Sequence, residues 1–107
     1  CEGSGVNAAL NYSAVPKIEE VETYIELQCI PGGTNRNWES YGHKISGIND
    51  KNKTLLCDPQ TSGGLLIAVL PEGENQLLDL FAEYELHLNS IGRLLPGKEE
   101  SPYIAVQ

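Results

Sequence analysis

The sequence predicts an α/β (α+β) fold, a single-domain sandwich of helices on a mixed β-sheet that spans residues 1–107. Segments with helical periodicity alternate with segments of strand type along the chain, which is typical of such layered folds. The length of 107 residues suits one domain that buries its own core without disulfides. A third observation is the continuous apolar run at residues 65–70, which predicts a buried strand.

The first half of the chain predicts one strand and two helices. Apolar and polar residues alternate from residue 6 to residue 12, which predicts a strand. Pro16 suits the first turn of a helix, and one face of that helix would carry Ile18, Val21 and Ile25. The sequence Pro-Gly-Gly at 31–33 ends it.

Thr34 then caps a short helix that runs through Trp38 towards Tyr41, and glycines at 42 and 47 break it. Trp38 and Tyr41 share one face of this helix, which indicates core packing rather than stacking on a base. The polar residues 49–53 predict a loop.

The second half predicts three strands and one helix. The strand at 65–70 leads through Pro71-Glu72-Gly73 into a helix with an apolar stripe at residues 77, 78, 81 and 82. Residues 87–94 and 103–106 complete the expected sheet.

Charge excludes two classes of partner. The net charge of -8, from 7 basic and 15 acidic residues, argues against nucleic acid, which needs a basic surface, and against anionic membranes. Residues 32–53 nevertheless hold four basic and two acidic residues, a local charge of +2. This is either ordinary loop solubility or a positive wall for a phosphorylated ligand.

The cysteine pattern predicts a reduced, cytoplasmic protein. Cys1, Cys29 and Cys57 form no Cys-x-x-Cys pair, and an odd, scattered set does not make a disulfide framework. Cys57 is expected to be a small buried hydrophobe and Cys29 to be structural. No apolar run approaches the length of about 20 residues that spans a bilayer. The chain begins with Cys1 and lacks methionine, so we expect it to be a fragment of a longer protein.

The most informative segment is Leu-Leu-Cys-Asp-Pro-Gln-Thr-Ser-Gly-Gly-Leu-Leu at residues 55–66. Asp58-Pro59 starts a turn, and the glycine pair allows positive φ and close approach of other backbone. Thr61, Ser62, Gly63 and Gly64 offer two hydroxyls and several amides, which suits an anion nest. The alternative is a tight turn before a strand, held by local Ser and Thr hydrogen bonds.

A second candidate segment is Gly32-Gly33-Thr34-Asn35-Arg36-Asn37. Glycines at a helix start leave free N–H groups where the helix dipole favours an anion. Arg36 can hold a phosphate through two hydrogen bonds. The alternative is a helix stop, a cap and a solvated arginine, with the Asn37 amide fixing loop backbone rather than touching substrate.

No catalytic residue and no metal site stand out. Asp58 is the only acid within the Asp58–Leu66 and Pro31–Trp38 motifs, and one carboxylate is a poor Mg²⁺ site, so we expect Asp58 to cap the turn. His43 and His87 lie far apart in the sequence and lack the spacing of metal ligands.

These two motifs carry a resemblance to a known family. The sequence Asp-Pro-Gln-Thr-Ser-Gly-Gly-Leu-Leu at 58–66 resembles a signature of the selenide, water dikinase family (selenophosphate synthetases). Pro-Gly-Gly-Thr-Asn-Arg-Asn-Trp at 31–38, followed by Ser-Tyr-Gly at 40–42, resembles another signature of that family, in the expected order. Together the two motifs cover about a quarter of the chain. The wider superfamily, which includes aminoimidazole ribonucleotide synthetase, shares the Thr-Ser-Gly-Gly element.

The resemblance implies the C-terminal domain of a two-domain enzyme that makes selenophosphate from selenide, ATP and water, releasing AMP and phosphate with Mg²⁺. It implies a homodimer whose ATP and metal ligands lie mainly in the N-terminal domain. That family's reactive Cys or selenocysteine, its lysine and its aspartate cluster match nothing in this chain. We therefore expect the chain to be inactive alone, to bind no cofactor by itself, and to help its N-terminal domain close the ATP cleft.

Two alternatives remain open at this point. One is the equivalent domain of a sister ATP-dependent synthetase of purine biosynthesis or hydrogenase maturation. The other is a non-enzymatic module in which the two loops bind a protein partner.

Overall fold

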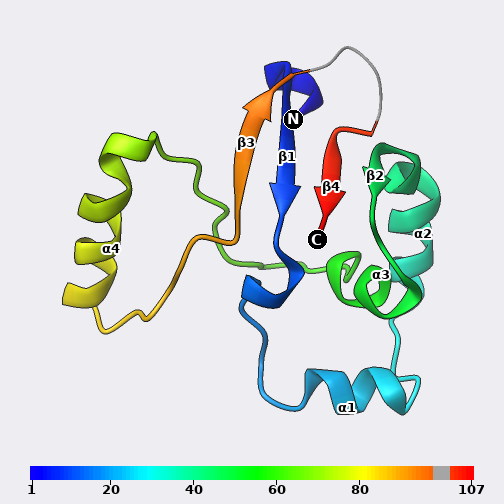
Figure 1. The fold of residues 1–107 in the computed structure, drawn as a ribbon. Coiled ribbons are helices and arrows are strands. Elements are labelled where there is room, and N and C mark those ends of the chain that lie inside the picture. Colours follow the sequence, from blue (N-terminus) through cyan, green and yellow to red (C-terminus); the bar gives the residue numbers. More distant parts are fainter. Residues whose placement is uncertain (98–101) are drawn as a thin grey trace.

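The computed structural model describes residues 1–97 and 102–107 and shows a mixed sheet with helices at one edge (Figure 1). The strands are β1 (Val6–Leu10), β2 (Ile45–Ser46), β3 (Gly92–Pro96) and β4 (Ile104–Val106), in the order β2-β4-β1-β3. β4 runs parallel to β1 and β2, whereas β3 is antiparallel to β1. The predicted α/β fold with a mixed sheet is therefore confirmed.

The helices are α1 (Val21–Glu26), α2 (Gly32–Tyr41), α3 (Asp50–Leu56) and α4 (Glu74–Glu83). Short 3-10 turns are η1 (Glu2–Ser4), η2 (Tyr12–Ala14), η3 (Gly42–Lys44) and η4 (Pro71–Gly73). In Figure 1, α2 and α3 lie beside β2, while α4 stands apart from the sheet beyond β3. No helix of the described residues is both long and apolar enough to cross a membrane.

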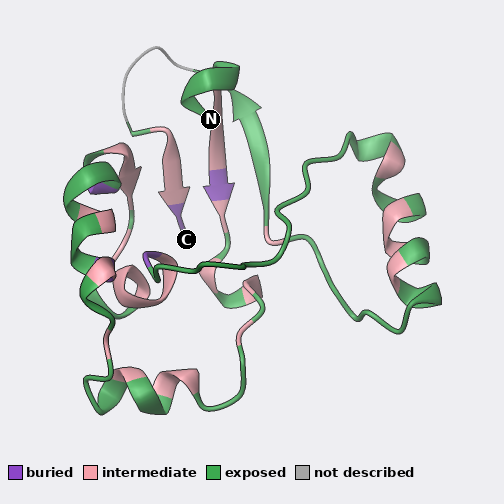
Figure 2. Cartoon of the chain, turned by 180° about the vertical axis from the view of Figure 1, so that it is seen from behind, coloured by how far each residue is buried: buried purple, intermediate pink, exposed green. Residues whose placement is uncertain are grey.

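The buried core is small and lies at the centre of the sheet. The buried hydrophobic residues of the described chain are Ala9 on β1, Val106 on β4 and Cys57 after α3 (Figure 2). Cys57 is thus the small buried hydrophobe that the sequence predicts. Cys29, expected to be structural, is instead exposed.

The helix expected from Pro16 begins five residues later, at Val21. Glu20 adopts a left-handed conformation with φ of 68°, which prevents helical geometry from extending back through it. The next helix, α2, starts at Gly32 rather than after Thr34, with Pro31 as its N-cap. Helix α2 ends at Tyr41, as the glycine at 42 predicts. The Trp38 ring packs closely on that glycine, because a Cβ added to Gly42 would lie 2.5 Å from the ring. Tyr41 is exposed and Trp38 is only half-buried, so neither residue belongs to the buried core that the sequence predicts for that face.

The prediction of a loop at 49–53 is wrong, because these residues start α3. Asn49 caps that helix by accepting the backbone N–H of Asn52 at 2.9 Å. Lys53 pairs with Asp50 one turn earlier, at 3.1 Å. The apolar residues that anchor α3, Leu55 and Leu56, follow the polar stretch, so the first turn alone has the composition of a loop.

The prediction of a buried strand at 65–70 is also wrong. These six residues form no regular secondary structure, and all are exposed. They pair with no strand of the described sheet. An apolar run shows that a segment favours burial, but it does not show which surface covers it.

The strand expected at 87–94 lies instead at 92–96. The register with β1 places Gly92 opposite Leu10, the last residue of β1, so residues 87–91 extend beyond its end. Of these residues, Ile91 still accepts the Asn11 N–H at 2.8 Å through its main-chain oxygen. The strand at 103–106 is found as β4, and the helix after residues 71–73 is found as α4.

Candidate phosphate-binding site

The start of α2 presents open backbone amides. Pro31 precedes the helix with extended backbone, φ -63° and ψ 141°, and contributes no side-chain cap. Gly32 is exposed, and a Cβ added there would meet no atom within 4 Å. The first N–H groups of a helix have no partner inside it, so this end can donate to a bound anion.

Gly33 is where the two candidate segments touch. A Cβ on Gly33 would lie 2.8 Å from both Cβ and Cγ of Pro59, closer than such atoms approach in proteins. Only glycine allows the first turn of α2 to rest on the Asp58-Pro59 turn. The structure thus brings together the beginnings of both predicted motifs.

Asn37 forms a second link between the same segments. Its Nδ2 donates to the main-chain oxygen of Cys57 at 2.9 Å, in a partly buried position. The expectation that the Asn37 amide fixes loop backbone is therefore confirmed. Cys57 itself is an inert thiol, because burial raises its pKa.

Arg36 supplies the positive charge of this region. Its guanidinium folds back over the first turn of α2, with Nη2 3.8 Å from the position of a Cβ on Gly33. The side chain is exposed and forms no ion pair with any described residue. The N–H donors of Gly32, Gly33 and Arg36 therefore lie close together at one exposed surface.

The other basic residues of the +2 segment do not form a positive wall, since each is paired with a carboxylate. The pairs are Lys44 with Glu2, Lys51 with Glu22 at 2.7 Å, and Lys53 with Asp50 at 3.1 Å. Arg36 alone of the four basic residues keeps an unpaired charge within the described chain.

Thr34 and Asn35 occupy opposite environments in the first turns of α2. Thr34 is 1% exposed, and its Oγ1 has no hydrogen-bond partner among the described residues. Its main-chain N–H donates to the Pro31 oxygen at 3.0 Å, so Thr34 lies inside the helix instead of capping it. Asn35 is exposed. Of the predicted site residues, Thr34 is the one that this structure keeps away from solvent.

The second predicted loop, Thr61 to Gly64, is fully exposed and follows Pro59 directly. Neither the Thr61 nor the Ser62 hydroxyl forms a hydrogen bond with a described residue, so local Ser and Thr bonds do not hold this turn. Gly63 lies against the flexible end of the Gln60 side chain. The loop is thus exposed to solvent, and the anion nest stays a prediction.

The remaining candidate groups contribute little to this site. The Asp58 main-chain N–H donates to the Leu55 oxygen at 3.3 Å, while its side chain shows no capping bond within the described chain. No group of three or more His, Cys, Asp or Glu side chains among residues 1–97 and 102–107 could hold a metal ion.

Sequence reasoning missed the two partners that position the site, Pro59 and the Cys57 oxygen. The sequence predicts only a turn at Pro59, and a main-chain oxygen has no residue-type signature. The one clue in the sequence is proximity, because Cys57 and Pro59 lie in the same segment as the predicted Thr61–Gly64 loop.

Residues 1–105 match the family described as AIR synthase related protein, C-terminal domain. The chain is 60% identical over 94 residues to the selenide, water dikinase of Pseudomonas putida, covering 88% of this chain and 27% of that protein. It is 54% identical over 106 residues to the selenide, water dikinase of Yersinia pestis, covering 99% of this chain and 30% of that protein. The chain is 50% identical over 104 residues to the selenide, water dikinase of Pasteurella multocida, covering 97% of this chain and 30% of that protein.

The chain thus spans less than a third of the length of these curated relatives. Its match to the family, in contrast, extends over nearly every residue, including both segments that meet at Gly33 and Pro59. The chain belongs to the AIR synthase related protein family, as a C-terminal domain of that family.

Proposed function

We propose that this chain is the C-terminal domain of a selenide, water dikinase. The observation that carries the proposal is the 60% identity with the Pseudomonas putida enzyme over 88% of the chain. The parent enzyme would make selenophosphate from selenide, ATP and water, and release AMP and phosphate. It would be a cytoplasmic homodimer in which residues 1–107 form one domain and a separate N-terminal domain carries the catalytic groups.

The role proposed for the start of α2 is to bind a phosphate group of ATP or of a reaction product. Gly32 and Gly33 would donate main-chain N–H groups, and Arg36 would supply charge and two further donors. Thr61–Gly64 would close on the same phosphate from the neighbouring turn. Asn37 would act by holding that turn through the Cys57 oxygen, and Thr34 by filling a buried position in the first turns of α2.

Mg²⁺ does not fit the described residues of this chain, because no cluster of carboxylates is available to hold it. We therefore assign metal binding and most nucleotide contacts to the N-terminal domain, and expect residues 1–107 to be inactive alone. The part proposed for this chain is to bind and orient phosphate and to cover the cleft.

A titration followed by NMR tests the binding role. Mg·ATP and then AMP would be added to the ¹⁵N-labelled chain, with Arg36→Gln and Arg93→Gln as matched variants. Both arginines are exposed, but only Arg36 lies at the site. We expect shifts at 32–37 and 61–64 that Arg36→Gln weakens and Arg93→Gln leaves unchanged. The absence of shifts at millimolar ligand would mean that these loops are shaped only for a partner domain.

A domain exchange tests the identity of the reaction. Residues 1–107 would replace the matching segment of the Pseudomonas putida enzyme, and selenophosphate formation would be measured. We expect activity in the chimaera and a loss on Arg36→Gln. A folded chimaera that makes no selenophosphate would favour a sister synthetase instead.

A further inference from the structure

A groove runs between α4 and the chain that leads into it. Its volume is about 630 Å³, within the range of about 300–1,000 Å³ that is typical of binding pockets. Leu77 and Leu80 of α4 line it together with Val69, and Leu80 and Val69 are 48% and 46% exposed. Helix α4 stands apart from the sheet in both views of the chain (Figures 1 and 2), and the groove is open to solvent.

The groove combines apolar and acidic side chains at helical spacing. Leu77 and Leu80 are three residues apart, and Asp79 and Glu83 are four apart, so each pair consists of neighbours on the helix surface. All four side chains line the groove. Neither Asp79 nor Glu83 forms an ion pair with a described residue. The apolar part of the groove is thus flanked by carboxylates without a cationic partner in the described chain.

The charge around the groove favours a basic occupant. Residues 54–92 hold six acidic side chains and neither lysine nor arginine, a local charge of -6 within the total of -8. A second copy of the chain would bring the same acidic surface against this one, and like charges that face each other across an interface are costly. An occupant with lysine or arginine beside its apolar residues would instead neutralise Asp79 and Glu83.

The shape of this surface favours a helix as the occupant. One wall is α4 itself, a helix of 10 residues, and helices pack by placing the side-chain ridges of one into the grooves of another. An apolar seam with charged flanks is the arrangement through which paired helices select partners of opposite charge. Among the ways in which proteins bind peptides, an amphipathic helix in an apolar groove therefore fits these residues.

We infer that α4 and residues 69–73 bind a basic amphipathic helix of another protein. The apolar face of that helix lies on Leu77, Leu80 and Val69, and its lysine or arginine side chains pair with Asp79 and Glu83. This surface lies beyond β3, whereas α2, with the proposed phosphate site, lies beside β2 at the other edge of the sheet (Figure 1). The inference therefore goes beyond the proposed function and does not depend on it.

A pair of synthetic peptides tests the charge and the apolar contact together. The probe is a fluorescently labelled amphipathic helix of about 14 residues, with leucine on one face and lysine on both flanks of that face. The control peptide has glutamate in place of each lysine. We expect fluorescence anisotropy to show that the 107-residue chain binds the lysine peptide at micromolar concentration, and at least about tenfold more tightly than the glutamate peptide. Added salt should weaken this binding, because the charges are exposed.

Matched variants locate the contact. Asp79→Asn with Glu83→Gln removes two charges at the groove, whereas Glu19→Gln with Glu26→Gln removes two exposed charges before and within α1. We expect the first double variant to weaken binding of the lysine peptide about tenfold, and the second to weaken it by less than about twofold. In spectra of the ¹⁵N-labelled chain, the peptide should shift the amides of residues 69–83. Far-ultraviolet circular dichroism checks that each variant is folded.

Several results would overturn the proposal. One is failure to bind the lysine peptide, or equal affinity for both peptides. Another is equal weakening by the two double variants, which would mean that only the overall negative charge attracts the peptide. Shifts at 69–83 that appear without peptide as the chain concentration rises would mean that a second copy fills the groove. Loss of peptide binding in the chimaera with the Pseudomonas putida enzyme would mean that the rest of that enzyme fills it.

Discussion

At the residue scale, the contact of Gly33 with Pro59 predicts opposite effects at two adjacent glycines. Gly33→Ala places a Cβ 2.8 Å from the proline ring and must displace it. We expect this to lower the free energy of unfolding by about 1–3 kcal/mol, the usual cost of overpacking. Gly32→Ala meets no atom and gains helix propensity, so it should be neutral or stabilising by up to about 1 kcal/mol. Urea unfolding of both variants measures the difference, and equal effects would contradict the close contact.

The hydrogen bond of Asn37 predicts that alanine substitution at two asparagines of α2 has different effects on stability. Asn37→Ala removes the donor of the 2.9 Å bond to the Cys57 oxygen and leaves a partly buried acceptor unpaired. The expected loss of stability is about 1–2 kcal/mol. The matched control is Asn35→Ala, an exposed position of the same helix with no hydrogen bond recorded in the described chain. Both changes gain the same helix propensity, so the difference between them reports the bond. Unfolding curves that coincide would show that the bond contributes nothing.

Much of this site could be predicted from the chemistry of its residues. The rest depends on contacts between distant segments, which residue types do not reveal. The open glycine amides, the charge of Arg36 and the role of Asn37 can be predicted, because each depends on what the side chain, or its absence, can do. The burial of Thr34 and the position of Pro59 on Gly33 depend on how two distant segments pack. No local pattern contains that information.

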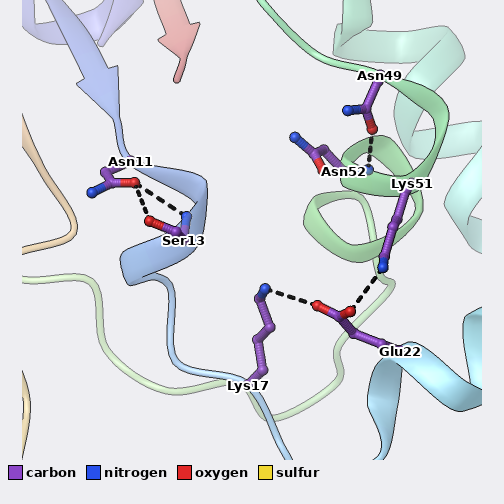
Figure 3. A network of polar contacts seen from close by, with 7 residues as sticks. All are labelled: Asn11, Ser13, Lys17, Glu22, Asn49, Lys51 and Asn52. Carbon is purple, nitrogen blue, oxygen red and sulfur yellow. Dashed lines mark hydrogen bonds and ion pairs between the residues drawn. The ribbon is translucent and has the colours of Figure 1, made fainter.

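At the element scale, one carboxylate attaches α1 to the rest of the chain. Glu22 of α1 accepts from Lys51 of α3 at 2.7 Å and from Lys17 of the preceding loop at 3.2 Å (Figure 3). Lys17 also lies 4.2 Å from the centre of the Tyr12 ring, which connects the same network to η2. Because α1 buries none of its own residues, these contacts are its main polar link to the neighbouring helix.

The network makes the attachment of α1 sensitive to acid. Hydrogen bonds from Lys51 and Lys17 hold the pKa of Glu22 below its ordinary value of 4.5. Because the pKa of Glu22 is lower in the folded chain than in the unfolded chain, the ion pairs stabilise the fold fully at a pH above the unfolded-state pKa. This stabilisation is lost as the pH falls through the lower, folded-state pKa. The melting temperatures of the unmodified chain and of Glu22→Gln should therefore differ at neutral pH and converge by about pH 3.

Glu19→Gln is the control for that comparison, since Glu19 is exposed and forms no ion pair with a described residue. It should follow the unmodified chain at every pH. High salt should reduce the effect of Glu22→Gln, because these pairs are exposed to solvent. A Glu22 effect that persists unchanged in acid would assign the attachment of α1 to apolar packing.

The elements that the sequence predicts well are those whose partners lie close in the chain or whose pattern is complete. β1 and α4 carry full alternation or a full apolar stripe. β2 is two residues long and exists only because it pairs with β4, so periodicity has too few positions to detect it. The run at 65–70 shows the converse, a strong strand pattern whose partner is not in the described sheet.

At the scale of the whole molecule, the chain is more open than its length requires. The radius of gyration over Cα atoms is 15.1 Å, whereas a compact domain of this length has about 13 Å. The difference arises from α4 and its two connections, which extend away from the sheet in both views of the chain (Figures 1 and 2). An open arrangement of this kind leaves apolar side chains such as Leu66 and Leu70 uncovered.

Small-angle X-ray scattering of the chain at low concentration tests this openness directly. We expect a radius of gyration near 15 Å, as in the structure. A value of about 13 Å would mean that α4 and residues 65–70 fold back onto the sheet of their own chain. In that case the apolar run and the exposed edge of β3 are covered within one chain, and the separation of α4 from the sheet is not the arrangement in solution.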